Sequence, residues 1–441
     1  MAVRIAVSFR TAFALATACA RVGAAVAGCK PDADWTGYPC DATAPCMSGW
    51  QCAGKVCVPA SSPATDSGGD AKGGRGLKGP PRIGYLYVGP VGDHGWTKAH
   101  DDGRKYLEAA MPGTFTETAP STPAADAAAK IDEFVANGDN VIIGTSYDFL
   151  LAVQNRAANY PDVNFLICSG FITSPNMGSY FGRMYQVKWL AGKVAGHATK
   201  TGRIGVVAPV PIAEVVRHIN AFTRGVRSVN ASAVVDVIWI HNWFDVEKEP
   251  KTTRDLVTRG ADVIVAMTDT TIPLETSTTL KTQAGDPVWS IGYDNLDSCQ
   301  FAPDTCLASA GWNWGPLVVA QVRAMVDGTW DPLPYVWEQV KADPQQSPAY
   351  LAINEKLVPA TVRVQVEELI PQLAKPGIEG QQVPFQAPVR DNAGKERLAS
   401  GSRFDDQDLL RMCWFVDGVV DADASGKTVP AVVPSACVGD R

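Results

Sequence analysis

Aromatic, hydroxyl and carboxylate side chains recur in this chain directly after short runs of apolar residues. An aromatic face can stack on a flat ring, and a carboxylate accepts hydrogen bonds from amino or hydroxyl groups but disfavours an anionic ligand. The pattern therefore indicates a binding site for a planar small molecule that carries hydrogen-bond donors. The candidate residues, which follow apolar runs in this way, are Asp93, Trp96, Ser146, Tyr147, Phe171, Trp243, Phe244, Asp269, Asp294, Trp312 and Asn313.

These residues can converge only if the apolar runs are neighbouring strands of a parallel sheet. From residue 82 onward, β-rich runs alternate with amphipathic stretches, and a second such series begins at residue 203. Apolar strands that alternate with helices predict parallel sheets covered on both faces, and two series predict two similar lobes. In such sheets a ligand sits beyond the carboxyl ends of the strands, which is where the candidate residues lie. The main strands are expected at 83–88, 141–144, 165–168, 203–207, 234–240, 263–266 and 288–293.

Each candidate also has an ordinary structural role open to it. Most Trp side chains belong to cores, so Trp96 would equally serve as a buried anchor at the start of a helix expected at 96–110. Asp and Asn are common helix caps. The interpretation as a binding site rests on the candidates as a group.

Catalytic and metal-binding motifs are not evident in the sequence. His94 and His100 stand near Asp101 and Asp102, but their spacing does not place them on one helical face. The His-Glu-x-x-His and Gly-x-Ser-x-Gly patterns do not occur. The glycine-rich residues 89–95 lack the Gly-Lys-Ser/Thr ending of a phosphate loop. We therefore expect a binding protein with no cofactor and no metal, and not an enzyme.

Length and charge limit the classes of protein to which the chain can belong. The chain has 441 residues and a formal charge of −7. The length is too great for one ordinary core and suits two lobes with appendages. The acidic balance argues against nucleic-acid binding, which requires a basic surface.

The N-terminus has the pattern of an export signal. Arg4 and Arg10 precede a short apolar stretch, and residues 26–28 (VAG) precede Cys29 as in the lipobox of bacterial lipoproteins. Arg21 interrupts the apolar stretch, so an ordinary secretory peptide with a coincidental Cys is the alternative. We expect lipid attachment at Cys29 and a location in the periplasm or on the cell surface, anchored to a bacterial membrane.

The remaining cysteines support an oxidising compartment. Positions 40, 46, 52 and 57 form a cluster that allows three disulfide pairings, of which 40–52 with 46–57 is one. Zinc is disfavoured because Cys-x-x-Cys spacing and a nearby His are lacking. Cys299 is expected to pair with Cys306 and Cys413 with Cys437, which leaves Cys168 as a buried thiol.

The domain organisation follows from these segments. It comprises a signal peptide (1–28), a Cys-rich knot (29–59), a flexible linker rich in Ser, Pro and Gly (60–80), lobe 1 (81–200), lobe 2 (201–311), and a final segment (312–441) with a crossover, the completion of lobe 1 and a tail.

Several motifs together resemble the basic membrane protein (BMP) family of substrate-binding lipoproteins. The resemblance covers most of the chain, from about residue 82 to residue 419. The motifs are residues 84–97 (GYLYVGPVGDHGWT), 181–186 (FGRMYQ), 199–205 (TKTGRIG), 220–222 (NAF), 243–245 (WFD), 260–264 (GADVI), 312–315 (WNWG) and 412–419 (MCWFVDGV).

The resemblance implies a type I periplasmic-binding-protein fold, with two doubly wound Rossmann-like lobes joined by hinge crossovers. It implies a monomeric receptor that delivers adenine, guanine or a purine nucleoside to an ABC permease. In the nucleoside-binding branch two aromatic residues sandwich the purine, and Trp96 and either Phe244 or Trp243 match them. Asp294 matches an Asp that binds ribose hydroxyls.

One departure from that branch bears on the ligand. Trp312 and Asn313 stand where the nucleoside-binding branch has a Lys after a Thr-Ser pair, which favours the free base over the nucleoside. The alternative functions are a ligand-sensing or surface-interaction lipoprotein, suggested by the Cys-rich knot, and a nucleoside hydrolase that would use the carboxylates to activate water.

Overall fold

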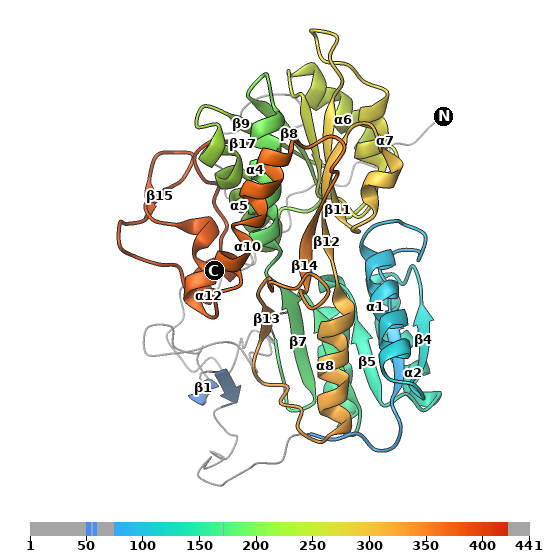
Figure 1. Cartoon of the computed structure of the whole chain (residues 1–441). Helices are drawn as coiled ribbons and strands as arrows, with labels where there is room; N and C mark the ends of the chain where they lie inside the picture. The colour runs from blue at the N-terminus through green and yellow to red at the C-terminus, as the bar shows by residue number, and fades with distance from the viewer. Residues whose placement is uncertain (1–49, 54–55, 60–74, 171, 422–441) are drawn as a thin grey trace, which may run out of the picture. The chain divides into compact units, whose positions relative to one another are not determined.

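The computed structural model describes residues 50–53, 56–59, 75–170 and 172–421 (Figure 1). The chain divides into two compact units, Met1–Thr65 and Asp66–Arg441. The described part of the first unit is an antiparallel hairpin of β1 (Trp50–Ala53) and β2 (Val56–Pro59), in which Cys52 and Cys57 are opposite each other. The predicted signal peptide, the predicted lipidation site Cys29 and the predicted linker as far as residue 74 lie outside the described residues.

The second unit contains two large sheets and the two-stranded sheet of β15 and β16, and the first large sheet forms lobe 1. Its strand order is β13-β7-β6-β5-β3-β4, and all its pairings are parallel. Its strands are β3 (Arg82–Leu86), β4 (Phe115–Ala119), β5 (Val141–Gly144), β6 (Asn164–Cys168), β7 (Met177–Gly182) and β13 (Val336–Glu338).

Helices cover both faces of the lobe 1 sheet. Successive strand residues point to opposite faces, so the apolar side chains of one strand pack against helices on both sides. Val141 and Ile143 belong to the same cluster as Leu107 of α1 (Trp96–Ala110) and Val318 of α8 (Trp314–Val326). Ile142 instead packs with side chains of α2 (Ala127–Ala136) and α3 (Leu150–Asn159) on the other face.

The second sheet forms lobe 2 in the order β14-β12-β11-β10-β8-β9-β17, parallel except where β14 meets β12. Helices α4 (Met184–Ala198) and α5 (Ala213–Val229) pack on each other, as do α6 (Lys248–Thr258) and α7 (Ile272–Thr278). The strands are β8 (Arg203–Ala208), β9 (Val234–Trp239), β10 (Val263–Ala266), β11 (Trp289–Asp294), β12 (Cys306–Trp312), β14 (Ala349–Ile353) and β17 (Val419–Asp421).

The chain crosses between the sheets after β7, after β12 and between β13 and β14. The segment predicted as crossover, completion of lobe 1 and tail thus also supplies β14 and β17 to lobe 2. The remaining elements are η1 (Ala124–Asp126), η2 (Tyr147–Phe149), η3 (Ser298–Phe301), η4 (Val383–Phe385), α9 (Ala360–Glu367), α10 (Ile370–Leu373), α11 (Ile378–Gln381), α12 (Asp406–Leu410), β15 (Val389–Arg390) and β16 (Glu396–Leu398).

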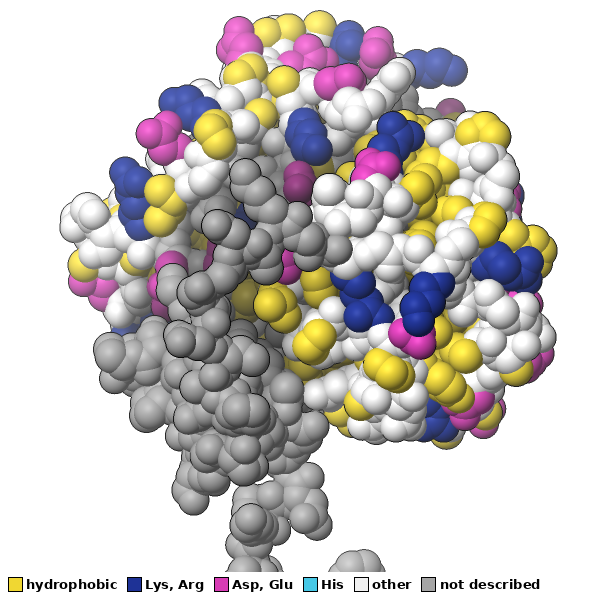
Figure 2. Space-filling view, turned by 90° about the horizontal axis from the view of Figure 1, so that it is seen from below, with side chains coloured by type: hydrophobic (Ala, Val, Ile, Leu, Met, Phe, Trp, Pro, Cys, Tyr) yellow, Lys and Arg dark blue, Asp and Glu magenta, His cyan; other side chains and the backbone are white. Residues whose placement is uncertain are grey.

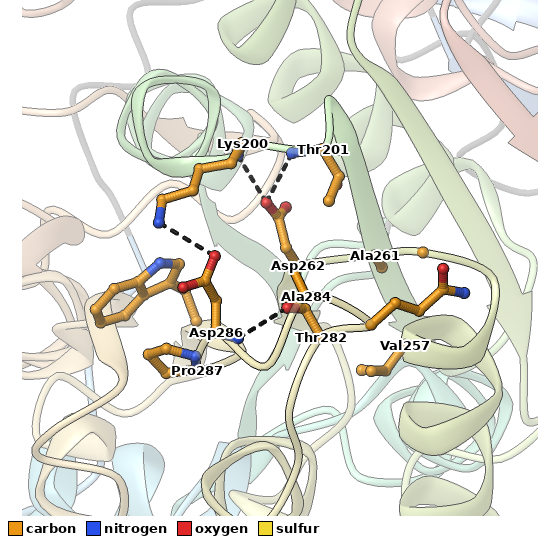
Figure 3. Close-up of a pocket in the computed structure, with 12 residues that line it drawn as sticks. Lys200, Thr201, Val257, Ala261, Asp262, Thr282, Ala284, Asp286 and Pro287 are labelled. Atoms are coloured by element: carbon orange, nitrogen blue, oxygen red, sulfur yellow. Dashed lines mark hydrogen bonds and ion pairs between the residues drawn. The ribbon is translucent and has the colours of Figure 1, made fainter.

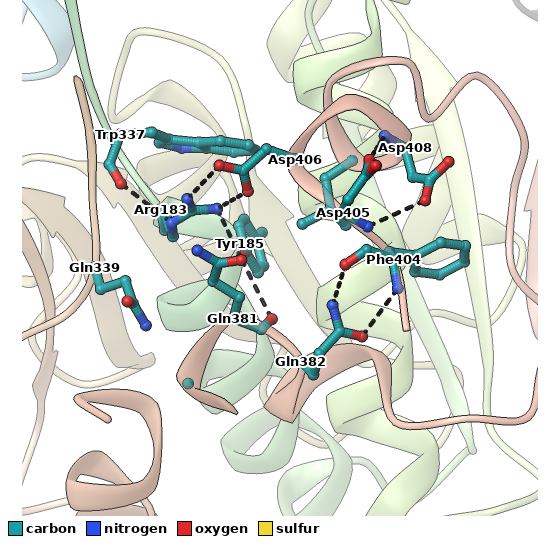
Figure 4. A network of polar contacts seen from close by, with 12 residues as sticks. Arg183, Tyr185, Trp337, Gln339, Gln381, Gln382, Phe404, Asp405, Asp406 and Asp408 are labelled. Carbon is teal, nitrogen blue, oxygen red and sulfur yellow. Dashed lines mark hydrogen bonds and ion pairs between the residues drawn. The ribbon is translucent and has the colours of Figure 1, made fainter. Parts of the chain in front are cut away.

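The C-terminal segment is fixed to the crossovers by Arg183, which directly follows β7 (Figure 4). Its buried guanidinium pairs with both carboxylate oxygens of Asp406, at 2.8 and 2.9 Å. The same group lies 4.2 Å from the ring centroid of Trp337. Because Asp406 belongs to α12 and Trp337 to β13, one side chain joins three segments that are distant in sequence.

The Sγ atoms of Cys299 and Cys306 are 2.05 Å apart, Cys168 is a buried free thiol, and Cys413 also takes part in a disulfide, while its predicted partner Cys437 lies outside the described residues. On the face shown in Figure 2, basic and acidic side chains are interspersed among the described residues. None of the helices in the described ranges is long and apolar enough to cross a bilayer.

Candidate functional site

A cavity lies where the carboxyl ends of the strands in the two lobes meet. It has about 20 Å³ of free space, room for about one water molecule, so the lobes are closed on it. Lobe 1 and lobe 2 both contribute to its wall. The lining residues are Val88, Trp96, Ser146, Tyr147, Ser169, Glu214, Val215, Trp243, Met267, Asp269 and Tyr293.

Trp96 is both a buried anchor and a wall of this cavity. Its indole Nε1 donates to the carbonyl of Thr145 at 2.8 Å, which fixes the ring, and its side chain is 7% exposed. Trp312 meets it edge-on at 5.8 Å and itself stacks on Trp314 at 4.3 Å. The two interpretations of Trp96 are therefore compatible, because a ring held by its neighbours presents a rigid surface to a ligand.

Asp93 has a capping role in the structure. Its carboxylate accepts hydrogen bonds from the backbone N–H groups of Gly95, Thr97 and Lys98 at 2.8–3.0 Å. Burial raises the pKa of Asp93, while these three hydrogen bonds act in the opposite direction. The carboxylate thus stabilises the start of α1 beside the cavity.

Asp294 is completely buried at the end of β11, with a positive φ of 62°. One carboxylate oxygen accepts from Nε1 of Trp312 at 3.0 Å, and the other has no partner among the described residues. The ammonium of Lys188, on α4, lies 3.3 Å from the ring centroid of Tyr293 and is also without a hydrogen-bond partner there. Burial raises the pKa of Asp294 well above its usual range, and the positive charge of Lys188 lowers it in part.

Asp269 lines the cavity just beyond β10 and is 5% exposed. Its backbone N–H donates to the carbonyl of Trp243 at 3.0 Å, but its carboxylate receives no hydrogen bond from any described residue. Burial raises its pKa well above the usual range, and the negative charges of Asp294 and Asp93 raise it further. This carboxyl group is therefore available to a ligand.

Three contacts hold the lobes together around the cavity. Ser169 Oγ donates to Glu214 at 2.7 Å, and Nε1 of Trp243 donates to Asp148 at 3.0 Å. A Cβ atom at Gly95 would lie 1.9 Å from the carbonyl oxygen of Asp269, so only glycine permits this approach. In each pair one residue belongs to lobe 1 and the other to lobe 2.

The structure places the predicted residues unequally. Trp96, Ser146, Tyr147, Trp243 and Asp269 line the cavity, and Asp294 and Trp312 lie directly behind it.

Asp93 caps α1 and does not line the cavity, and two other predicted residues, Phe244 and Asn313, lie away from it. Phe244 is 37% exposed and is not among the lining residues, while Phe171 lies outside the described residues. Asn313 donates instead to the carbonyls of residues 344, 345 and 347, and so holds a loop.

Sequence reasoning did not single out Glu214 or Lys188. Glu214 stands in the first turn of α5, after β8, so the rule of strand carboxyl ends would have found it. Lys188 lies in the middle of α4, where nothing in the local sequence marks a buried charge. Within residues 75–170 and 172–421, no group of three or more His, Cys, Asp or Glu residues is placed to hold a metal ion.

A larger cavity, of about 390 Å³, lies at the amino ends of the lobe 2 strands, opposite the ends that face the first cavity (Figure 3). Asp262, just before β10, is at its centre and accepts hydrogen bonds from Thr199 Oγ1 at 2.6 Å and from the backbone N–H groups of Lys200 and Thr201 at 2.6 and 2.9 Å. The carboxylate of Asp262 is thus already paired within the protein.

Two sheets, parallel except at β14, that meet at a cavity beyond the carboxyl ends of their strands form a two-lobed α/β fold. Solved structures share this fold. A solute-binding protein of an ABC transporter system from Aeropyrum pernix K1 has a TM-score of 0.57 at 17% identity, over 67% of this chain and 91% of that one. A transcriptional activator of the comK gene from Bacillus halodurans has a TM-score of 0.56 at 22% identity, over 67% and 98%. They confirm the predicted type I fold.

Sequence comparison identifies the family. The Bmp family model, described as ABC transporter substrate-binding protein PnrA-like, matches residues 81–334, and the chain belongs to this family. A purine-binding protein of Brucella abortus is 33% identical over 77% of this chain and 93% of its own length. A Haloferax volcanii protein, TsgA13, named as a proposed glucose-binding protein of an ABC transporter, is 32% identical over 60% of this chain and 65% of its own.

Proposed function

We propose that this protein captures a purine base in the cavity between its lobes and delivers it to the permease of an ABC importer. The observation that carries the proposal is the pairing, on one small cavity, of a fixed indole face at Trp96 with a carboxyl group at Asp269 that lacks a protein partner. A heterocycle with an exocyclic amino group satisfies both, because its ring stacks and its N–H groups donate.

The dimensions and surroundings of the cavity support the free base over the nucleoside. The closed cavity is small, and bulky Trp312 fills the space behind Trp96. Asp294, which the resemblance assigns to ribose hydroxyls, is completely buried and bonded to Trp312. A ribose would have to displace these rings, whereas a flat base needs a smaller opening of the lobes.

Delivery to a permease accords with the family and with the sequence of the N-terminus. The predicted signal peptide and Cys29 would hold the protein outside the cytoplasm on a lipid anchor, within reach of a membrane transporter. The name of the Brucella relative supports a purine, and that of the Haloferax relative makes a sugar the ligand to test against it.

Calorimetric titration of the purified chain with adenine, guanine, adenosine and glucose tests the proposal, after removal of any co-purified ligand identified by native mass spectrometry. We expect a base to bind at least about tenfold more tightly than its nucleoside, because ribose requires displacement of packed rings. Chromatography of the ligand after incubation should recover it unchanged. Binding of glucose but of no purine would contradict the proposed ligand. Cleavage of adenosine would favour the alternative function of a nucleoside hydrolase.

A further inference from the structure

The carboxylates around the cavity differ in their hydrogen-bond donors. Asp148 accepts from Nε1 of Trp243 and Glu214 from Ser169 Oγ. Buried Glu249 accepts from Thr268, Thr270 and the backbone N–H of Asp245, at 2.7–2.8 Å. Asp93 and Asp294 have the donors described above. Among the described residues around the cavity, the carboxylate of Asp269 alone has no donor.

The charges that act most strongly on Asp269 are negative. Asp294 faces it from the end of β11, Asp93 from the start of α1, Asp148 from η2 and Glu249 from α6. The buried cations of the region face other acids, since Lys188 acts on Asp294 and Arg217 on Glu214. If Asp269 ionised beside these acids, its negative charge would be buried without a hydrogen bond or a counter-charge, which is unfavourable.

We propose that Asp269 holds the ligand as a neutral carboxylic acid and takes up one proton from solvent as the lobes close. This inference rests on the proposed function and specifies the ligand further. A protonated carboxyl offers one O–H donor and one carbonyl acceptor side by side. Adenine presents the complementary pair, a ring nitrogen that accepts next to an amino group that donates.

The preference follows from this pairing. In the complex the carboxyl O–H donates to the ring nitrogen and the carbonyl oxygen accepts from the amino group, and no covalent bond of the ligand changes. On its Watson–Crick edge guanine offers two adjacent donors, N1 and N2, which match an ionised carboxylate instead. Asp269 therefore selects adenine-like ligands for as long as it carries the proton.

The direction of the pH dependence follows from the raised pKa of buried Asp269. In the open, solvated cleft this carboxyl ionises near its usual pKa, and closure raises that pKa. Between the two values, binding takes up a proton, so affinity falls by up to about tenfold for each unit of rising pH.

Titration of the full chain with adenine between pH 5 and pH 8, in two buffers of different ionisation enthalpy, measures the protons taken up. We expect about one proton per adenine bound and an affinity that falls as the pH rises. The variant Asp269→Asn presents a fixed donor and acceptor, so it should bind adenine within about tenfold of the parent at pH 6 and lose the pH dependence. Asp269→Leu, of similar size but without polar atoms, should bind at least about tenfold more weakly than Asp269→Asn.

The outcomes separate this inference from the proposed function. If adenine binds without proton uptake and with no dependence on pH, the proposal that Asp269 is protonated is wrong, while the proposal of a purine ligand stands. If Asp269→Asn loses as much affinity as Asp269→Leu, the site needs an ionised carboxylate, and the proposal that Asp269 is protonated is again wrong. Failure of every purine to bind would overturn both.

Discussion

Strand β10 has a buried aspartate at each of its ends, and the two are used differently. Asp262, before the strand, accepts three hydrogen bonds from residues 199–201. Asp269, after it, accepts none from the described residues, although it is 5% exposed and Asp262 is 3% exposed. The two carboxylates are similarly buried but differ in the hydrogen bonds that they accept. Asp262 therefore stabilises the fold, whereas Asp269 remains available to another molecule.

The cavities at these two ends show why size alone does not identify the site. The cavity beside Asp262 measures about 390 Å³ and the one beside Asp269 about 20 Å³. The larger one lies beside a satisfied acid. The smaller one is enclosed by both lobes, and its aromatic and acidic groups lack full protein pairing, as expected of a site that closes on its ligand.

The largest expected contrast is between Asp269→Leu and Asp262→Leu. The first should weaken adenine binding by about 1.5–3 kcal/mol because the ligand loses its polar partner. The second should leave affinity unchanged but lower the stability of the fold by about 1–3 kcal/mol, because the N–H groups of Lys200 and Thr201 lose their acceptor. Calorimetry and thermal unfolding measure the two effects. Equal losses of affinity would show that the ends of β10 are not functionally distinct.

Trp96 and Trp289 line the cavities at the two ends of β10. Trp96→Ala should weaken purine binding by about 1–3 kcal/mol, the scale of stacking between a base and an aromatic ring. The matched control is Trp289→Ala, which removes an indole from the cavity beside Asp262. Tryptophan fluorescence or calorimetry should find that control unchanged in affinity. A Trp96→Ala protein that binds every purine normally would remove this ring from the site.

A smaller effect is expected at Asp139, a buried acid at the amino end of β5, whose carboxylate accepts no backbone hydrogen bonds like those of Asp262 and instead lies 3.6 Å from the guanidinium of Arg82. Burial, and then the nearby Glu117, raise its pKa to about 7. The folded protein thus holds a proton that the unfolded chain releases near pH 4, so stability falls as the pH rises from about 4 to 7.

The variant Asp139→Asn removes that titration. It should raise the melting temperature by about 1–3 °C at pH 8, with no gain near pH 4. Scanning calorimetry at the two pH values measures the difference. A gain of equal size at both would mean that Asp139 does not titrate in this range.

The sequence predicts the elements better than it predicts the pairing of side chains. The helix expected at 96–110 is α1, and the strand expected at 263–266 is β10, because hydrophobic periodicity is a local property. Asn313, by contrast, bonds to a loop more than thirty residues further on, which local sequence does not reveal. The same is true of Lys188, which is buried where α4 packs against α5, β12 and β14 of lobe 2.

The most direct test of the account is hydrogen exchange, measured by mass spectrometry on the unmodified chain with and without adenine. Adenine should slow exchange in the segments that follow the strands of the cavity, at residues 87–97, 145–148, 267–270 and 292–295. Residues 199–201 and 282–287, around Asp262, should be unaffected. Protection at this second set, or at neither, would contradict the placement of the ligand at the carboxyl end of β10.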